Sequence, residues 1–346
     1  MKKREQETPG GTRRIEEVAR LAGVSPITVS RTLNKPDTVS EKTRARVQEA
    51  IDKIRYVPNH VAGGLASSKS RTIGLIIPHI GNSTFADSVQ GMTDIFSPEG
   101  YHLLLGISGY SLEAEHRNVM AFLSQRVAAM SLHGSTHSER TTDVLRHAGI
   151  PICESSTLSD KPIDMAVGYS NEAACYAMVE HLARCGYRKI AFMSAPVLNN
   201  DRIMGRLVGY TNAVKALGLF QAPSLALETP IGIASGGKGF VELMSRHPDL
   251  DVVFCADDTL AFGSMLEARR RGIGVPDDVG IAGFADVELA QEFVPALTTV
   301  RLKRYEMGVA AARLLLQRLR GETPARTIVD LGFEIIARGS TRRPKT

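Results

Sequence analysis

The N-terminal part of the chain carries apolar residues at the spacing of amphipathic helices. Ile15, Val18, Ala19 and Ala22 recur every three or four positions and would share one face of a first helix. Gly23 ends this pattern, because glycine readily adopts the left-handed conformation that often follows the last turn of a helix. The pattern therefore predicts a short helix followed by a tight turn.

A second helix is predicted directly after that turn. Ser25 is a favourable N-cap, and Pro26 falls at the first helical position, where its missing N–H costs nothing. Val29 and Leu33 then form an apolar stripe. Two short helices joined by a glycine-containing turn are typical of a helix-turn-helix, although an ordinary helical hairpin has the same pattern. A third amphipathic helix capped by Ser40 favours the helix-turn-helix, because three helices would close a small core.

The start of the second helix is the candidate DNA-reading surface, since in this geometry it enters the major groove. Arg31 is the best candidate for a bidentate contact to guanine, and Ile27 is a second candidate for base selection. The residues that we expect to contact DNA are Ser25, Pro26, Ile27, Thr28, Ser30, Arg31 and Asn34 in this region, with Asn59 and Leu65 further along the chain.

A short segment after the third helix, residues 59–66, has a helical pattern of its own. Pro58 separates it from the third helix by favouring extended backbone at the preceding residue. Asn59 would cap the new helix, and Leu65 would lie on its apolar face. Such a helix is marginal by itself, because isolated helices shorter than about 12 residues hardly form in water.

From residue 73 onward, continuous apolar runs alternate with helical patterns. This alternation indicates parallel sheets covered by helices on both faces, and its repetition predicts two Rossmann-like subdomains. The expected strands lie at residues 73–77, 102–107, 127–132, 190–193, 252–255 and 280–283. The expected helices lie at residues 85–96, 114–123, 173–185, 206–217, 239–244 and 260–270.

Charge and composition separate the two parts of the chain. Residues 1–71 hold fifteen Lys and Arg against eight Asp and Glu, whereas residues 72–346 hold 27 against 29. A basic helical part suits a polyanionic partner, and a hydrophobic content of 43% is ample for real cores in the remainder. Residues 1–11 are expected to form a disordered basic tail.

Several classes of function lack their sequence signals. The four cysteines have no CxxC spacing and the histidines no metal spacing, so we expect reduced thiols in the cytoplasm and neither metal nor cofactor. No apolar run approaches the roughly 20 residues of a membrane span, and no signal core follows Met1. Gly232–Gly239 resembles a phosphate-binding loop, but Gly239 replaces the required Ser or Thr, so a flexible loop before a helix is expected. Asp258 is interpreted as a helix cap rather than as a catalytic acid, and nothing favours an enzyme.

Three segments carry a resemblance to a known family. "EEVARLAGVSPITVSRTLN", "VSEKTRARVQEAIDKIRYVPN" and "ALTTVRLKRYEMG" resemble the Lac/Gal repressor (LacI/GalR) family of bacterial transcription regulators, from about residue 15 to residue 340. The resemblance implies a small all-α helix-turn-helix domain plus an α/β domain of the type I periplasmic-binding-protein architecture. The implied boundaries are a DNA-binding domain at 12–58, a hinge helix and linker at 59–71, an effector domain at 72–340 and a tail at 341–346. The N-subdomain would span 72–170 and 300–330, and the C-subdomain 171–299 and 331–340.

The family likeness also assigns roles to single residues. The segment around Leu65 corresponds to a hinge helix that inserts a leucine into the minor groove, although Gly63 and Gly64 depart from the family and each weaken a helix by about 1 kcal/mol. In open parallel sheets, ligands bind beyond the carboxyl ends of the strands. The family positions at those ends are His79, Asn82, Phe85, His133, Arg202, Arg206, Asp257 and Asp286.

One departure changes the expected ligand. The aspartate that commonly binds sugar hydroxyls in the family is Ala285 here, while Arg202 and Arg206 are present. A site that loses a carboxylate and keeps two arginines favours an anion. The alternatives are a solvated Arg202 and an ion pair between Asp257 and Arg206.

The segments "GYSLEAEH", "DMAVGYSNEAA", "VPDDVGIAGFADVELAQ" and "VDLGFEI" look most like the gluconate-operon repressors of the family. We therefore expect a homodimer or tetramer that binds double-stranded operator DNA and leaves a palindromic operator when gluconate or a related aldonate binds the cleft between the subdomains. The alternatives are a regulator that responds to a neutral sugar or purine, a solute-binding transport protein, and an enzyme with a DNA-binding arm.

Overall fold

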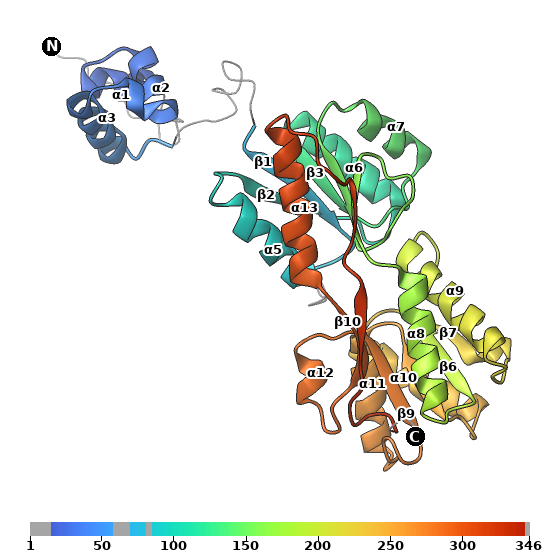
Figure 1. The fold of residues 1–346 in the computed structure, drawn as a ribbon. Coiled ribbons are helices and arrows are strands. Elements are labelled where there is room, and N and C mark those ends of the chain that lie inside the picture. Colours follow the sequence, from blue (N-terminus) through green and yellow to red (C-terminus); the bar gives the residue numbers. More distant parts are fainter. Residues whose placement is uncertain (1–14, 58–69, 81–84, 343–346) are drawn as a thin grey trace. The chain divides into compact units, whose positions relative to one another are not determined.

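The computed structural model describes residues 15–57, 70–80 and 85–342 of the chain. The chain divides into two compact units, Met1–Ser70 and Arg71–Thr346, which are described separately (Figure 1). The first unit is helical, and the second combines two sheets with helices.

The first unit contains three α-helices around a small apolar core. They are α1 (Ile15–Ala22), α2 (Pro26–Asn34) and α3 (Glu41–Ile54), with a 3-10 turn at Pro36–Thr38. Gly23 has a φ of 61° directly after α1, and the side chains of Ser25 and Ser40 cap α2 and α3, so these predicted helix signals are confirmed. The core includes the fully buried residues Val18, Val29 and Val47.

The second unit contains two six-stranded sheets with the same strand order. The orders are β11-β5-β4-β3-β1-β2 and β12-β10-β9-β8-β6-β7, which confirms the two predicted Rossmann-like subdomains, called the first and second lobe below. Among the strands described, only the β10–β12 pair is antiparallel. The first sheet consists of β1 (Thr72–Ile77), β2 (His102–Ile107), β3 (Ala129–His133), β4 (Ile152–Ser155), β5 (Met165–Gly168) and β11 (Ile328–Asp330). The second consists of β6 (Ile190–Ser194), β7 (Ala226–Glu228), β8 (Val252–Cys255), β9 (Gly280–Ala285), β10 (Thr298–Leu302) and β12 (Phe333–Ile336).

Helices cover both faces of the first sheet. Ile73 and Leu75 of β1 pack in one apolar cluster with α5 and α13, whereas Ile76 packs in another with α6 and α7, as the alternation of side chains along a strand requires. The helices of this lobe are α5 (Ala86–Phe96), α6 (Leu112–Ser124), α7 (Glu139–His147) and α13 (Arg304–Leu319).

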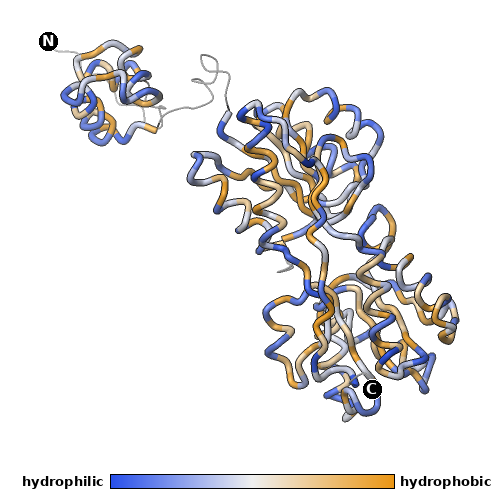
Figure 2. The backbone as a smooth tube through the Cα atoms, viewed as in Figure 1, coloured by the Kyte–Doolittle hydropathy of each residue, from blue (hydrophilic) through white to orange (hydrophobic). Residues whose placement is uncertain are grey.

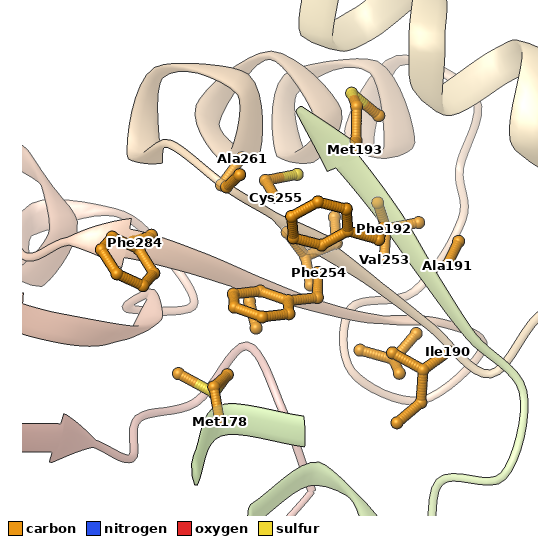
Figure 3. Close-up of a cluster of buried hydrophobic side chains, with 14 of the residues drawn as sticks. Met178, Ile190, Ala191, Phe192, Met193, Val253, Phe254, Cys255, Ala261 and Phe284 are labelled. Carbon is orange, nitrogen blue, oxygen red and sulfur yellow. The ribbon is translucent and has the colours of Figure 1, made fainter. Parts of the chain in front are cut away.

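The second lobe is built around one large apolar cluster. Phe192, Phe254 and Phe284 from three neighbouring strands meet in it, and Met178 joins them from a covering helix (Figure 3). The hydropathy of the tube in Figure 2 follows this arrangement, with hydrophobic strands inside and polar loops outside. The helices are α8 (Asn171–Arg184), α9 (Asp201–Ala216), α10 (Ile233–Arg246), α11 (Asp258–Arg270) and α12 (Leu289–Glu292).

The chain passes between the two lobes three times, as Figure 1 shows. It leaves the first lobe after β5, returns after β10 into α13, and leaves again between β11 and β12. The apolar pattern alone did not reveal α7, α12, α13 or the strands β4, β5, β7, β10, β11 and β12.

The expectation of a flexible loop at Gly232–Gly239 is wrong, because α10 begins at Ile233. Its glycines let α10 approach α11 closely. A Cβ atom on Gly236 would lie 2.3 Å from the Leu260 carbonyl oxygen, and one on Gly263 would lie 2.0 Å from that of Ile233. Close packing of two helices therefore explains the glycine-rich sequence that resembled a phosphate-binding loop.

Replacement of Gly263 tests this packing, because the packing determines whether the free energy of unfolding rises or falls. In an open helical position, Gly→Ala stabilises a protein by up to about 1 kcal/mol. Because the added methyl group would overlap backbone here, we expect Gly263→Ala to lower the free energy of unfolding by about 1–3 kcal/mol in urea denaturation. Lys238→Ala, on the exposed face of α10, is the control and should change it by less than about 0.5 kcal/mol. A Gly263→Ala protein as stable as the wild type would contradict the packing.

Candidate functional site

The exposed start of α2 is formed by the residues expected to contact DNA. Exposed residues here are Ser25, Pro26, Ile27 and Arg31. Although Ile27 is apolar, 66% of its surface is exposed to solvent. Thr28 is half-buried, and its N–H donates to Ser25 Oγ at 3.2 Å in the cap. An exposed isoleucine beside an exposed arginine offers one apolar and one bidentate contact to base edges.

Arg46 fixes the turn that orients α2, a role that no pattern in the sequence indicated. Its guanidinium donates to the carbonyl oxygens of Ala22 and Gly23, the latter at 3.1 Å. These are carbonyls at the end of α1 that lack a partner within the helix. Ser30 is half-buried on α2. Asn59, Leu65 and the side chain of Asn34 lie outside the described residues.

The second unit has a cavity between its lobes, at the carboxyl ends of the parallel strands. Its volume is about 40 Å³, room for only a few water molecules, so a larger ligand requires the surrounding groups to move. The lining residues are Phe85, Tyr110, His133, Ser156, Tyr169, Asn200, Arg202, Ile203, Arg206, Ile231, Asp257, Leu302, Arg304 and Met307. Five of the eight predicted effector residues therefore meet here: Phe85, His133, Arg202, Arg206 and Asp257.

Arg206 is a buried cation of the cavity. Its Nε donates to Asn171 Oδ1 at 2.9 Å, its Nη1 to the Ala256 carbonyl oxygen at 2.6 Å, and its Nη2 to Tyr169 Oη at 3.4 Å. The guanidinium also lies 3.7 Å from the ring centroid of Phe284. These contacts hold the guanidinium plane in place through neutral groups.

Arg202 is buried and not solvated, and it reaches the opposite lobe. Its Nη1 donates to the His133 carbonyl oxygen at 2.7 Å, and the same atom lies 3.8 Å from Asp201 Oδ1. Asp201 in turn accepts hydrogen bonds from the backbone N–H and the hydroxyl of Ser135, both at 2.9 Å. The first residues of α9 therefore join the second lobe to the segment after β3.

Aromatic rings form the wall of the first lobe. Phe85 lies edge-on to His133, with ring centroids 4.6 Å apart, and His79 packs on Phe85 at 5.3 Å and on Tyr110 at 6.0 Å. His79 contacts two residues of this wall but does not itself line the cavity. Burial, and then the charges of Arg202 and Arg206, hold the pKa of His133 well below its usual value, so its ring is neutral at pH 7.

Arg304 is a third arginine of the cavity, which the sequence analysis did not identify. It begins α13, donates to Asp87 of α5 from Nε at 3.1 Å and from Nη2 at 2.7 Å, and binds the carbonyl oxygens of Ala285 and Asp286 across the lobes. In the sequence Arg304 is only an arginine that follows a strand. Its role could not be predicted from local pattern, because its partner Asp87 lies 217 positions away.

Two of the predicted aspartate roles change. Asp257, not Asp258, caps α11, and its Oδ1 accepts the N–H of Thr259 at 2.8 Å. Asp258 is fully buried and accepts hydrogen bonds from Thr299 Oγ1 at 2.7 Å and from the Val287 N–H at 3.0 Å, while burial raises its pKa to about 7. The cap differs from the expectation because α11 begins at Asp258, two residues before the expected start at residue 260.

Asp286 does not line the cavity. Its carboxylate accepts hydrogen bonds from Arg301 Nε at 2.6 Å and Arg338 Nη1 at 2.7 Å. Burial opposes its charge, but these two arginines outweigh that effect and lower its pKa. The structure thus gives Asp286 a role in holding the crossing strands together. Asn82 lies outside the described residues.

Within the described ranges, no cluster of three His, Cys, Asp or Glu side chains is arranged to hold a metal ion. No helix in the same ranges has the length and apolar character to cross a membrane.

Comparisons with known proteins agree with both units. The family described as bacterial regulatory proteins of the lacI family matches residues 14–59, and the periplasmic binding protein-like domain matches residues 179–341. The HTH-type transcriptional regulator GntR of Escherichia coli K12 is 34% identical over 326 residues, which cover 94% of this chain and 98% of that protein. The regulator IdnR of the same organism is 32% identical and covers 93% and 96%.

Solved structures give the same result. A LacI-family regulator from Silicibacter pomeroyi superimposes with a TM-score of 0.88 at 31% identity, covering 95% of this chain and 99% of that one. The transcription regulator GntR from Chromobacterium violaceum gives 0.75 at 33% identity, covering 78% and 99%. A three-helix unit with an exposed reading helix and a two-lobed unit with a central cavity define a ligand-controlled DNA-binding protein. The chain belongs to the LacI family and is a DNA-binding transcriptional repressor.

Substitution of Arg31 tests the reading surface. We expect Arg31→Ala to cost about 1–3 kcal/mol of binding free energy on a site selected from random DNA by the wild-type protein, with a much smaller loss on bulk DNA. Gel-shift titration at one fixed salt concentration measures both. Lys53→Ala, on the exposed surface of α3, is the control. Equal losses on the two DNAs would refute base reading by Arg31.

A buried ion cluster anchors the segment after β3. Residues His133 and Ser135 near this segment contact the second lobe. His137 Nδ1 lies 2.8 Å from Glu115 Oε1, and its Nε2 lies 3.5 Å from Glu154 Oε1. Burial opposes the charged ring, but the two carboxylates outweigh it and raise the pKa of His137 to about 9. The imidazolium therefore persists in the folded protein at neutral pH.

The pH dependence of stability follows from this raised pKa. The stabilisation by the imidazolium is fully present below the ordinary pKa of 6.5 and is lost as the pH rises through about 9. We expect His137→Gln to be less stable than the wild type at pH 6.5 and to differ from it less at higher pH. Urea denaturation of both proteins across this range measures the difference. A difference that does not change with pH would contradict the charged cluster.

Proposed function

We propose that the protein represses a sugar-acid utilisation operon and leaves its palindromic operator when gluconate or a related aldonate binds between the lobes. The lining of the cavity carries this proposal: among the described residues it contains three arginines, Arg202, Arg206 and Arg304, of which Arg304 is paired with Asp87, and one carboxylate, Asp257. Guanidinium groups bind carboxylates through two parallel hydrogen bonds, so an excess of arginine favours an anionic ligand.

The other lining groups suit the hydroxyl groups of a sugar acid. Ser156 and Asn200 offer polar side chains, and neutral His133 offers a ring nitrogen. Phe85 supplies an apolar surface for the carbon chain. A polyol with one terminal carboxylate matches both kinds of group, and the sequence resemblance to gluconate-operon repressors points to the same ligand.

Release from DNA is proposed to follow from closure of the lobes. A ligand between them adds contacts to an arrangement already joined by Arg202 with His133 and by Asp201 with Ser135. Such a ligand favours the closed state by its differential affinity, a coupling of typically 1–3 kcal/mol. In our proposal, closure spreads the hinge segments at residues 59–71 and lowers operator affinity.

The operator is proposed to be palindromic because the active species is a homodimer or a tetramer, and a two-fold dimer needs a two-fold site. The basic residues of the first unit would contact phosphates, which makes the affinity fall steeply with salt concentration. The protein would act in the cytoplasm, without a cofactor and without catalysis. Its relatives are transcription regulators, which supports the absence of an enzymatic role.

A ligand panel tests the proposed effector on the full chain. Thermal unfolding would be followed with gluconate, ketogluconates, 6-phosphogluconate, neutral hexoses and purines. A ligand at about a hundred times its dissociation constant adds roughly 2.7 kcal/mol of stability. We expect a shift with an aldonate only, and a neutral hexose or purine that shifts the midpoint instead would overturn the sugar-acid assignment.

Arg206→Gln should weaken gluconate binding roughly 10- to 100-fold in calorimetric titration, because it removes hydrogen bonds to a charged group. Arg269→Gln removes the same charge from the exposed surface of α11 and should bind gluconate like the wild type. Equal effects of the two substitutions would show that Arg206 does not bind the carboxylate.

A further inference from the structure

Asn171 connects the two lobes through its side-chain amide. It is the first residue of α8, where the chain enters the second lobe, and only 4% of its surface is exposed. Its Oδ1 accepts the Nε–H of Arg206 at 2.9 Å, and its Nδ2 donates to the Ser156 carbonyl oxygen at 3.0 Å. A single amide thus links the central arginine of one lobe to a cavity residue of the other.

The Ser156 side of this link is also tied to the cavity. Ser156 has a φ of 72°, a left-handed conformation that serine rarely adopts, and its hydroxyl lies 3.1 Å from His133 Nδ1. The bond from Asn171 holds the backbone of Ser156 in this conformation. Asn171 itself is held by close packing, because a Cβ atom on Gly205 would lie 3.2 Å from its Cβ.

Residue 171 is an asparagine and not an aspartate, so its side chain adds no negative charge beside the Arg206 guanidinium. Aspartate has nearly the same shape as asparagine and would accept the same bond from Arg206, but as a charged hydrogen-bonded pair. The structure has such pairs nearby, where Arg304 binds Asp87 and where Arg338 binds Asp286. The described hydrogen bonds of Arg206 end instead on an amide, a backbone carbonyl and a phenol.

We propose that Asn171 is a positioning and selectivity residue: it fixes the orientation of the Arg206 guanidinium without adding a carboxylate beside it, which directs the cavity towards anionic ligands. The inference rests on the proposed function, in which the anion is the carboxylate of an aldonate. Asn171 acts through Arg206 and does not itself line the cavity.

Two substitutions separate positioning from charge. Asn171→Asp keeps the acceptor for Arg206 Nε, loses the donor to the Ser156 carbonyl oxygen and adds a negative charge, whereas Asn171→Ala removes both the acceptor and the donor. By calorimetric titration of the full chain with gluconate and with glucitol, its neutral polyol counterpart, we expect Asn171→Asp to lose roughly tenfold or more in gluconate affinity, the worth of one charged hydrogen bond. Glucitol affinity should stay equal or rise. An equal loss for both ligands, or no loss of gluconate affinity, would overturn the proposal.

Asn212→Asp is the matched control for this charge. Asn212 is exposed on α9 and donates to Glu172, which is also exposed. The Asn212→Asp substitution adds the same negative charge as Asn171→Asp. It places this charge on α9, the helix that also carries Arg206, but outside the cavity. We expect the ratio of gluconate to glucitol affinity in this variant to equal that of the wild type.

A second measurement follows Arg206 directly and needs no ligand. In protein with 15N-labelled arginine, the Nε–H of Arg206 should exchange slowly with solvent in the wild type and in Asn171→Asp, and faster in Asn171→Ala. Equal exchange in the wild type and in Asn171→Ala would overturn the positioning role. If the wild type binds no aldonate, the proposed function fails, and this exchange experiment still decides whether Asn171 positions Arg206.

Discussion

The parallel pairing of strands is the constraint on which the second unit depends. A parallel pair needs a crossover connection, and the helices that supply these crossovers cover both faces of each sheet. Polar side chains are then left to gather where the strands end. Because both lobes have the same strand order, the ends of β3 and β8 bring His133 and Asp257 to one cavity. Ligand chemistry is confined to this place by the topology of the sheets.

The arginines around the cavity serve different purposes, and their partners reveal which. A buried charge is costly unless it is paired or hydrogen-bonded. Arg304 is paired with Asp87 and also binds Ala285 across the lobes, so it stabilises their arrangement. Arg206 is held by neutral oxygens from separate segments of the chain. This difference makes Arg206 the natural partner of a ligand anion and gives Arg304 a structural part.

The first unit achieves its task with a much smaller core. Three short helices bury a few aliphatic residues, and this core is enough to fix α2 with its polar and apolar reading residues exposed. Arg46 strengthens the turn by satisfying carbonyls at the end of α1. A rigid helix is suited to base reading because the contacts to DNA then do not have to order the helix first.

Local patterns determined the helix-turn-helix. Gly23, Ser25 and Ser40 act on the backbone within a few positions, and their effects follow from the sequence alone. Continuous apolar runs likewise determined six of the twelve strands described, since burial on both faces leaves a local trace. Family likeness added the arginines at the strand ends.

Only the tertiary structure decided which charged side chains near the strand ends are paired with other residues and which line the cavity. Arg301 and Arg338 take the carboxylate of Asp286, and Asn171 meets Arg206 across 35 positions of sequence. The glycines of α10 looked like a loop because their role depends on α11, which packs against them. Such contacts leave no periodic signal, since they join side chains that folding brings together from distant segments.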